Sequence, residues 1–414
     1  MGLSHPVCAR LEEQYGNDRM KCAVSSMCGY RSSMEDAHSV VLSLPRHKHA
    51  AFVGVYDGHG GQDAARHCAE HLADHIDALD DWSDEALQCG VMAFDATFCG
   101  PDNAFRDHGT TCVFALIEFD ANNPTTGDIR LTVCNSGDSR AIWSSTIPGQ
   151  EAQFDFLTMD HKPSLEGESK RIVNAGGHVT ADRVDGDLAL SRAIGDWRYK
   201  CNQSLPQEDQ KVIALPDIQR RKLSQSSRQG FLLIACDGIF EKLSNDRVNQ
   251  IVHEGLAQTS DPRGALEQLL QASLSAGSKD NMSAALVLFE DGTEYHKEAP
   301  TMDFGPLYTS DDACMTTFLR FCDQTGFGVQ ARAYIEAWHA EHGTAPVPAE
   351  PTDGNVDDAS PGPIFMTDAT GTHHKLVIQN ANGERHVISF SSDDIDSSDD
   401  DLDEDEQLGI VTSI

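Results

Sequence analysis

Basic residues are scarce in this sequence relative to acidic ones. It carries 31 Lys and Arg against 66 Asp and Glu, a formal net charge of −35 over 414 residues. Nucleic-acid phosphates are bound by basic surfaces, so this balance excludes a nucleic-acid partner. Part of the acidic excess is local, because residues 391–414 contain ten acids and no base.

Long apolar runs and secretory signals are also missing. No stretch approaches the roughly 20 apolar residues that a membrane span requires, and the first residues lack an apolar signal core. We therefore expect a cytoplasmic protein without a transmembrane segment, with nuclear or membrane-associated locations left open. Met1-Gly2 raises N-terminal myristoylation as a weaker alternative, with Cys8 as a palmitoyl candidate, although Pro6 stands where the acylation motif has Ser or Thr.

The twelve cysteines contain no Cys-x-x-Cys pair. Several lie inside apolar runs, among them Cys112, Cys134 and Cys236. This distribution indicates buried, reduced thiols in an intracellular protein, and it excludes a disulfide framework or a zinc site of that spacing.

What the sequence does contain is acidic residues at the ends of strand-like runs. The apolar runs 37–44 and 50–56 are joined by a short polar connection, which predicts a hairpin. In an antiparallel hairpin the start of the first strand lies beside the end of the second. We therefore expect Glu35 and Asp36 to meet Asp57 at one edge of a sheet.

A second pair of runs repeats this arrangement far along the chain. Asp237 follows the run 231–236, and Asp280 stands just before the run 282–289. If these strands are antiparallel neighbours, their acids share one end. Carboxylates gathered at strand ends are typical ligands of Mg²⁺ or Mn²⁺, so the sequence predicts a metal-centred hydrolase.

A pair of divalent ions would suit the hydrolysis of phosphate esters, because it activates water and neutralises the charge of the phosphoryl group. Gly58 could add a backbone carbonyl to the acids, since glycine lets the chain approach an ion closely. Arg31, just before the Glu35-Asp36 pair, could clamp a phosphate. His59, two positions after Asp57, could act as a general acid.

The rest of the chain favours an α+β fold. Apolar residues at helical spacing predict helices over 61–79, 84–99, 246–256 and 262–275, while strand-like runs dominate 111–158. Because strands and helices are segregated along the chain, antiparallel sheets covered by helices are favoured over a βαβ arrangement.

We divide the chain into an N-terminal extension (1–21), a catalytic domain (22–291) and a C-terminal part. The C-terminal part begins with a helical extension (302–342) and a linker (345–363) that holds five prolines. A hairpin-like segment (364–390) turning at Asn382-Gly383 and a disordered acidic tail (391–414) follow.

Several motifs resemble those of the metal-dependent serine/threonine protein phosphatases of type 2C, and they span roughly residues 22–291 in the family's order. They are Arg31-x-x-Met34-Glu35-Asp36-Ala37, Tyr56-Asp57-Gly58-His59-Gly60-Gly61, His108-Gly109-Thr110-Thr111, Asn135-Ser136-Gly137-Asp138-Ser139-Arg140, His161-Lys162-Pro163, Asn174-Ala175-Gly176-Gly177, Leu188-Ala189-Leu190-Ser191-Arg192-Ala193-Ile194-Gly195-Asp196, Ala235-Cys236-Asp237-Gly238-Ile239-Phe240 and Ser278-Lys279-Asp280-Asn281-Met282-Ser283.

The resemblance implies a four-layer αββα sandwich of two packed antiparallel sheets, with a dinuclear Mn²⁺ or Mg²⁺ site at one end. It implies that Arg31 binds phosphate, that His59 is the general acid and that Arg192 supports the local conformation. The metal ligands that it implies, direct or through water, are Glu35, Asp36, Asp57, Gly58, Asp237 and Asp280.

The resemblance also implies a weaker third ion near Asp138 and Thr111. Many family members have Asp four residues after the position of Asp237, where this chain has Glu241. The longer carboxylate of Glu241 could still serve that ion, so Glu241 is a candidate ligand beside Asp138 and Thr111.

We therefore predict hydrolysis of phosphoserine and phosphothreonine in proteins by direct attack of a water that bridges two divalent ions. Phosphorylated proteins are the expected substrates, and a monomer is the expected state. Two alternatives stay open. One is a metal-dependent phosphohydrolase of small molecules, which the same fold would allow, and the other is a non-catalytic signalling module.

Overall fold

The computed structural model describes residues 2–100, 102–145, 153–224, 230–297 and 299–342, together with 364–367, 373–379, 385–391 and 412–413. The chain divides into two compact units, Met1–Ala345 and Pro346–Ile414, and each is described by itself. Among these residues no helix is long and apolar enough to cross a membrane.

The predicted hairpin is present at the edge of a five-stranded antiparallel sheet. Its strands pair with Ala37 opposite Tyr56, so the chain enters the first strand beside the point where it leaves the second. The sheet runs in the order β14 (Asp217–Leu223), β8 (Ile129–Ser136), β7 (Cys112–Phe119), β4 (Ala50–Tyr56) and β3 (Ala37–Val41).

A second, seven-stranded sheet carries the other acid-bearing pair. Here β15 and β16 are antiparallel with Ala235 opposite Ala284, which brings the end of one beside the start of the other. The order is β10 (Gln153–Phe156), β9 (Arg140–Ser145), β15 (Gly230–Ala235), β16 (Met282–Leu288), β2 (Lys21–Gly29), β1 (Val7–Gly16) and β17 (Thr301–Asp303). The segment 1–21 therefore supplies β1, a strand paired along its length with β2.

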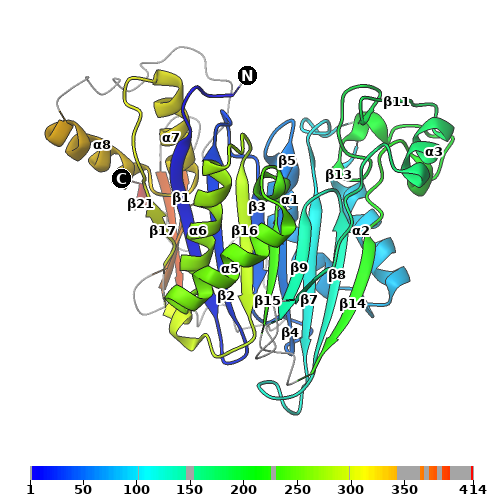
Figure 1. Cartoon of the computed structure of the whole chain (residues 1–414), viewed down its shortest axis with the longest axis horizontal. Helices are drawn as coiled ribbons and strands as arrows, with labels where there is room; N and C mark the ends of the chain where they lie inside the picture. The colour runs from blue at the N-terminus through cyan, green and yellow to red at the C-terminus, as the bar shows by residue number, and fades with distance from the viewer. Residues whose placement is uncertain are drawn as a thin grey trace. The chain divides into compact units, whose positions relative to one another are not determined.

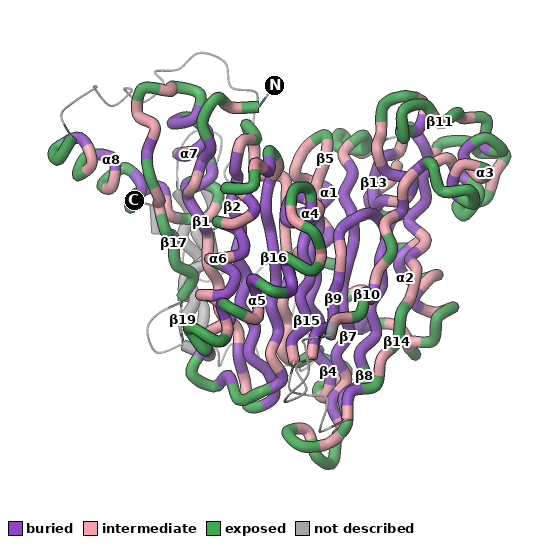
Figure 2. The backbone as a smooth tube through the Cα atoms, in the orientation of Figure 1, coloured by how far each residue is buried: buried purple, intermediate pink, exposed green. Residues whose placement is uncertain are grey.

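The two sheets pack face to face, and helices cover their outer faces. Successive side chains of a central strand point to opposite faces, and because both faces are buried, the sequence of such a strand is continuously apolar. In β4, Val53 and Val55 belong to the core between the sheets, whereas Phe52 and Tyr56 belong to the cluster beneath the helices. Each such buried Val or Phe contributes about 1.5–3 kcal/mol. Figure 2 shows the central strands of both sheets as mostly buried, and the edge strands β14 and β17 as mostly exposed or intermediate.

Helices cover the outer face of each sheet, as Figure 1 shows. The five-stranded sheet is covered by α1 (Asp63–Asp77) and α2 (Asp84–Phe98), and α2 begins at Ser83, whose hydroxyl accepts from Ala86 N. The seven-stranded sheet is covered by α5 (Asn245–Thr259) and α6 (Pro262–Ser275). The expected α+β sandwich with four layers is thus confirmed.

Short elements lie at the end of the sandwich where the acids gather. A three-stranded sheet is formed by β13 (Ile194–Gly195), β6 (Gly109–Thr110) and β5 (Gly58–His59). A side lobe holds α3 (Glu166–Asn174), β11 (Val179–Thr180), β12 (Arg183–Val184) and the 3₁₀ turns η1 (Trp197–Tyr199) and η2 (Gln207–Asp209). The one-turn helix α4 (Asp237–Phe240) follows β15 directly. The turn η4 (Thr293–Lys297) lies elsewhere, after the end of β16 that is remote from Asp280.

The segment 302–342 contains two helices, α7 (Asp312–Gln324) and α8 (Gly328–His342). They share an apolar cluster with the N-terminal strand, in which Val7 and Ala9 pack with Phe318 and Ile335. This cluster joins the two ends of the first unit.

The described residues of the second unit form an antiparallel sheet, in the order β18 (Ile364–Thr367), β19 (His373–Gln379), β20 (Arg385–Ser391) and β21 (Thr412–Ser413). The predicted linker 345–363, the predicted turn at Asn382-Gly383 and most of the predicted acidic tail lie outside the described residues.

Candidate metal centre and active site

Two acids from the five-stranded sheet face each other at its edge. Asp57 directly follows β4 and Asp36 directly precedes β3, and a carboxylate oxygen of each lies within 4.8 Å of the other and of the Cys236 sulfur. Both oxygens of Asp36 are buried, and the Ser283 hydroxyl and the Cys236 thiol lie close enough to favour its charged form without closing a hydrogen bond of ordinary geometry. A buried carboxylate that closes no hydrogen bond costs several kcal/mol unless a cation compensates it, so this pair fits a metal ion.

The second sheet adds Asp237 and Asp280 to the same cluster. Burial raises the pKa of Asp57 well above its ordinary value, and the charges of Asp36, Asp237 and Asp280 raise it further. Burial also raises the pKa values of Asp36 and Asp237 to about 7. These mutual effects place the four acids in one electrostatic cluster, whose repulsion a divalent cation would relieve.

The atoms that could bind a metal ion in this cluster are oxygens, with the sulfur of Cys236 as the exception. Burial raises the pKa of the Cys236 thiol well above its ordinary value, so the thiol stays neutral. Its sulfur instead accepts a hydrogen bond from Ser283 N at 3.1 Å. A neutral thiol is a poor ligand for hard cations, and the carboxylates suit Mg²⁺ or Mn²⁺.

Arg31 lies at the rim of this cluster. Its Nη2 donates to Asp280 Oδ2 at 2.6 Å, and its side chain is 56% exposed. More than half of the side chain therefore remains open to solvent, at the rim where an anion bound beside the acids would meet it.

Glu35 and Gly58 come together because the hairpin register brings their segments side by side. A Cβ on Gly58 would lie 2.3 Å from the Glu35 carbonyl oxygen, so only glycine permits this approach. The Glu35 carboxylate accepts from Gly61 N at 3.1 Å and from Ser33 Oγ at 2.8 Å.

A cleft of about 570 Å³ opens over these residues. Arg31, Glu35, Gly58, Glu241 and Asp280 all line it, and so do Gly2 and Leu3 from the N-terminal end. Leu3 N donates to Tyr30 O at 2.7 Å, which fixes that segment beside the loop of Arg31.

His59 is bound to an acid outside the metal cluster. Its Nε2 lies 2.7 Å from Asp196 Oδ2, and its side chain is 27% exposed. Burial acts to lower the pKa of His59, but the Asp196 carboxylate outweighs burial and the net shift is upward.

The residues predicted around a third ion have protein partners. Asp138 forms an ion pair with Lys162. The Thr111 hydroxyl accepts from Asp57 N at 3.0 Å and hydrogen-bonds Ser139 Oγ at 2.7 Å. Glu241 accepts from Lys279 N at 3.2 Å. A third ion stays a prediction.

Arg192 lies at the base of the side lobe, away from the acid cluster. It donates to Glu168 Oε1 at 2.7 Å, to Asp217 Oδ1 at 2.8 Å and to Leu215 O at 3.0 Å. These bonds tie α3 to the start of β14.

Sequence reasoning missed Asn281, which organises the loop of Arg31. Its Nδ2 donates to Cys28 O at 2.8 Å and to Ser33 O at 3.0 Å, and its Oδ1 accepts from Glu35 N at 2.9 Å. Position beside Asp280 was the only available signal, because its partners lie about 250 residues earlier.

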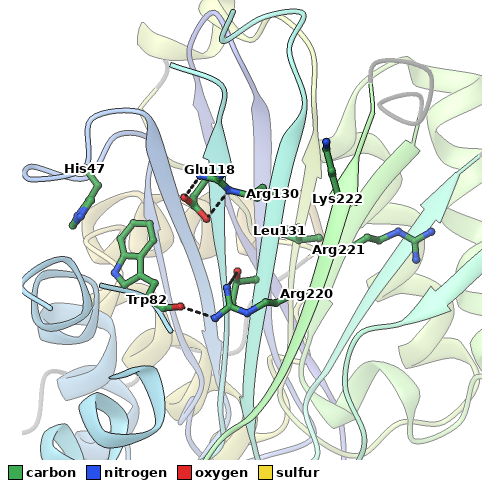
Figure 3. A pocket seen from close by; sticks show the side chains of 9 residues that line it. His47, Trp82, Glu118, Arg130, Leu131, Arg220, Arg221 and Lys222 are labelled. Carbon is green, nitrogen blue, oxygen red and sulfur yellow. Dashed lines mark hydrogen bonds and ion pairs between the residues drawn. The ribbon is translucent and has the colours of Figure 1, made fainter. Parts of the chain in front are cut away.

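A second cleft of about 570 Å³ lies on the outer face of the five-stranded sheet (Figure 3). Its bases are paired with acids: Arg130 with Glu118 at 2.8 Å, and Lys222 with Asp128 at 2.7 Å. Arg130 stands near the opposite end of β8 from the acid cluster, roughly 20 Å along the strand. This cleft is therefore separate from the candidate site.

Cys134 and Arg140 have the Cys-x5-Arg spacing of cysteine-dependent phosphatases. Cys134, however, is fully buried in the apolar cluster under α1 and α2, and burial raises the pKa of its thiol. It cannot reach a substrate or form a thiolate, so a cysteine nucleophile at this position is excluded.

Sequence comparison gives the class that this fold and site define. The family model described as Protein phosphatase 2C matches residues 20–282. A probable protein phosphatase 2C of Caenorhabditis elegans is 37% identical over 296 residues, which cover 69% of this chain and 79% of that protein. Human Protein phosphatase 1A is 32% identical, covering 72% of this chain and 78% of that protein.

Solved structures agree. A phosphatase from Toxoplasma gondii is similar with a TM-score of 0.61 and 26% identity, over 71% of this chain and 98% of that one. The chain belongs to the protein phosphatase 2C family, and it is a serine/threonine protein phosphatase of this metal-dependent class.

Proposed function

We propose that this phosphatase holds two Mn²⁺ or Mg²⁺ ions in the acid cluster. The residues that would hold them are Glu35, Asp36, Asp57, Asp237 and Asp280, with the carbonyl of Gly58. When bound, such ions lower the pKa of a shared water and neutralise phosphoryl oxygens. The observation that carries the proposal is the buried Asp36 carboxylate, which closes no hydrogen bond with the described residues and faces Asp57.

The remaining residues act on the substrate. Arg31 binds the phosphoryl oxygens with the part of its guanidinium that Asp280 leaves open. His59 gives a proton to the ester oxygen as it leaves, so that serine or threonine departs as an alcohol. The cleft is open to solvent and lined mainly by polar groups, which suits a phosphorylated segment of a protein.

The test is metal-titrated phosphatase activity of the wild type beside Asp57→Asn and Asp237→Asn. We expect wild-type turnover of a phosphoserine peptide to depend on added Mn²⁺ or Mg²⁺, and each variant to lose at least about a hundredfold. Calorimetric titration of the metals gives a readout that is independent of turnover, and both variants are expected to bind more weakly.

Paired assays decide between substrate classes. Hydrolysis of sugar phosphates or nucleotides at rates above those of phosphopeptides would favour the small-molecule alternative. A wild type that binds Mn²⁺ and hydrolyses no phosphate ester would favour the non-catalytic alternative.

A further inference from the structure

The three-stranded sheet at the site brings His59 next to a residue 137 positions later. In its register His59 lies opposite Gly109, and Gly109 lies opposite Gly195. Asp196 follows Gly195, and its carboxylate reaches back across the middle strand to His59 Nε2 at 2.7 Å. The Asp196 side chain is only 2% exposed, so His59 is a partner that this buried charge requires.

Gly109 has no side chain, and this leaves room for the side chains of Asp196 and His59 to meet across the middle strand. A Cβ at this position would lie 2.2 Å from Asp196 Oδ2 and 2.3 Å from His59 Nε2. Any other residue in the middle strand would push the carboxylate and the imidazole apart. Glycine at this position therefore permits the hydrogen bond between His59 and Asp196.

The backbone of Asp196 is held in an unfavourable conformation to make this contact. Its φ of 58° and ψ of 44° lie in the left-handed region, which is sterically unfavourable for a residue that carries a Cβ. Asp196 N donates to His108 O at 3.0 Å, which fixes the residue against β6.

A buried ion pair anchors the same turn to α2. Gly195 N donates to Asp95 Oδ1 at 2.7 Å, and Lys200 Nζ lies 2.9 Å from both oxygens of Asp95. Lys200 also donates to Ala193 O at 2.7 Å. The position of the Asp196 carboxylate is therefore determined from both sides of the turn.

We propose that Asp196 is a positioning residue for His59, an inference that rests on the proposed function. By accepting from Nε2–H, the carboxylate fixes the ring orientation and reserves Nδ1 for the substrate. The described residues offer no hydrogen-bond partner to Nδ1.

In the reaction, the bond between phosphorus and the ester oxygen breaks and its electron pair stays on that oxygen. The oxygen takes the proton from Nδ1, while Nε2 keeps its proton and its bond to Asp196. The attacking water forms the new phosphorus–oxygen bond and releases a proton to solvent, from which Nδ1 is reprotonated. Without Asp196 the ring can rotate or carry its proton on the wrong nitrogen.

Two substrates whose leaving groups differ in their need for a proton distinguish a positioning role of Asp196 from a purely structural one. For Asp196→Asn we expect kcat on a phosphoserine peptide to fall at least about tenfold, because a serine alkoxide needs a proton to leave. Turnover of para-nitrophenyl phosphate should change less than about threefold, because nitrophenolate leaves without one. The matched control is Asp155→Asn, which breaks a surface ion pair with Arg221 and should leave both rates unchanged.

Two further measurements address the mechanism. His59→Gln should give the same substrate-selective loss, and the double variant should lose no more than either single one. In wild-type protein, ¹⁵N spectra of the imidazole should show Nε2 protonated, and in Asp196→Asn a mixture of tautomers. If Asp196→Asn folds poorly, Gly109→Ala interrupts the same contact and should give the same selective loss.

Equal loss on both substrates, no loss on either, or additive loss in the double variant would overturn the role of Asp196. A wild type inactive on both substrates would instead overturn the proposed function.

Discussion

At Gly58 the backbone runs so close to the segment of Glu35 that a single added methyl group would force the two segments apart. A Cβ would meet the Glu35 carbonyl oxygen at 2.3 Å and Ala65 Cβ at 3.3 Å. For Gly58→Ala we expect the two segments to separate and the affinity for Mn²⁺ to fall at least about tenfold, measured by calorimetry.

Gly167→Ala is the control for that substitution. No atom of the described part of the chain lies within 4 Å of a Cβ at Gly167, which sits in α3. Metal affinity should therefore be unchanged, and stability should rise by about 0.5–1 kcal/mol. Unchanged metal affinity in Gly58→Ala would show that the close approach does not shape the metal site.

Glu168 gives a prediction about pH. Burial acts to raise the pKa of Glu168, but hydrogen bonds from Arg192 and the charge of Arg171 lower it to about 2. Because the folded-state pKa is depressed, the stabilisation is complete above about pH 4.5 and is lost as the pH falls toward 2. For Glu168→Gln we expect a loss of about 3 kcal/mol at pH 7, since two largely buried guanidinium groups each lose the charged one of their partners on α3.

Urea unfolding at pH 7, 4 and 3 measures the effect. The difference between wild type and Glu168→Gln should shrink toward low pH, whereas Glu166→Gln, an exposed acid in the same helix, should match wild type throughout. A difference that stays constant down to pH 3 would contradict the depressed pKa of Glu168.

Single residues also mark the limit of sequence reasoning. Asp57 and Asp237 could be chosen because each follows an apolar strand and precedes glycine. Asp196 and Asn281 could not be assigned roles, because their partners depend on register between two-residue strands and on contacts across about 250 residues. Local spacing carries no information about either.

At the scale of elements, α7 contacts the loop that presents Arg31. Thr317 Oγ1 donates to Ser32 O at 3.3 Å, and Arg320 Nη1 lies 3.4 Å from the same oxygen. We expect Thr317→Ala combined with Arg320→Ala to loosen this loop and raise KM for a phosphopeptide about three- to tenfold, with calorimetric Mn²⁺ affinity unchanged.

Thr316→Ala is the matched control, because that hydroxyl bonds within the helix to Asp312 O and faces solvent. It should leave KM at the wild-type value. If the double variant also keeps its KM, α7 supports the fold without positioning the loop.

The elements that the sequence predicted best are those with buried faces. Both acid-bearing strand pairs and the helices on either sheet follow from apolar spacing. The N-terminal strand was harder to predict, because Arg10, Glu12 and Glu13 interrupt its apolar pattern. Arg10 is nevertheless buried, paired with Glu12 at 2.8 Å and Asp303 at 3.0 Å. Only pairing with β2 and β17 gives these charges a place in a sheet.

At the scale of the whole molecule, the chain separates into two units after Ala345. We expect removal of 346–414 to leave the melting temperature and the turnover of the first unit unchanged. Removal of 300–414 should lower the melting temperature by several degrees, because it strips Phe318 and Ile335 from Val7 and Ala9. Differential scanning calorimetry of the two truncated chains checks both expectations, and equal melting temperatures would contradict them.

The sequence predicted which segments of the chain form helices and strands, but not that the N-terminal strand packs against the helices of 302–342. Helical spacing in 302–342 indicated helices, yet their partner strand lies some 300 residues earlier, at a distance that periodicity cannot bridge. The substrate sequence that the cleft prefers depends on loop shapes, which composition does not determine.

The position of Gly2 and Leu3 in the wall of the cleft has a practical consequence for anyone handling this enzyme. An affinity tag, a fluorophore or an acyl chain joined ahead of Gly2 would begin at the wall of the cleft that phosphorylated segments are expected to enter. Purification handles and immobilisation chemistry joined ahead of Gly2 should therefore be removed before the enzyme is assayed.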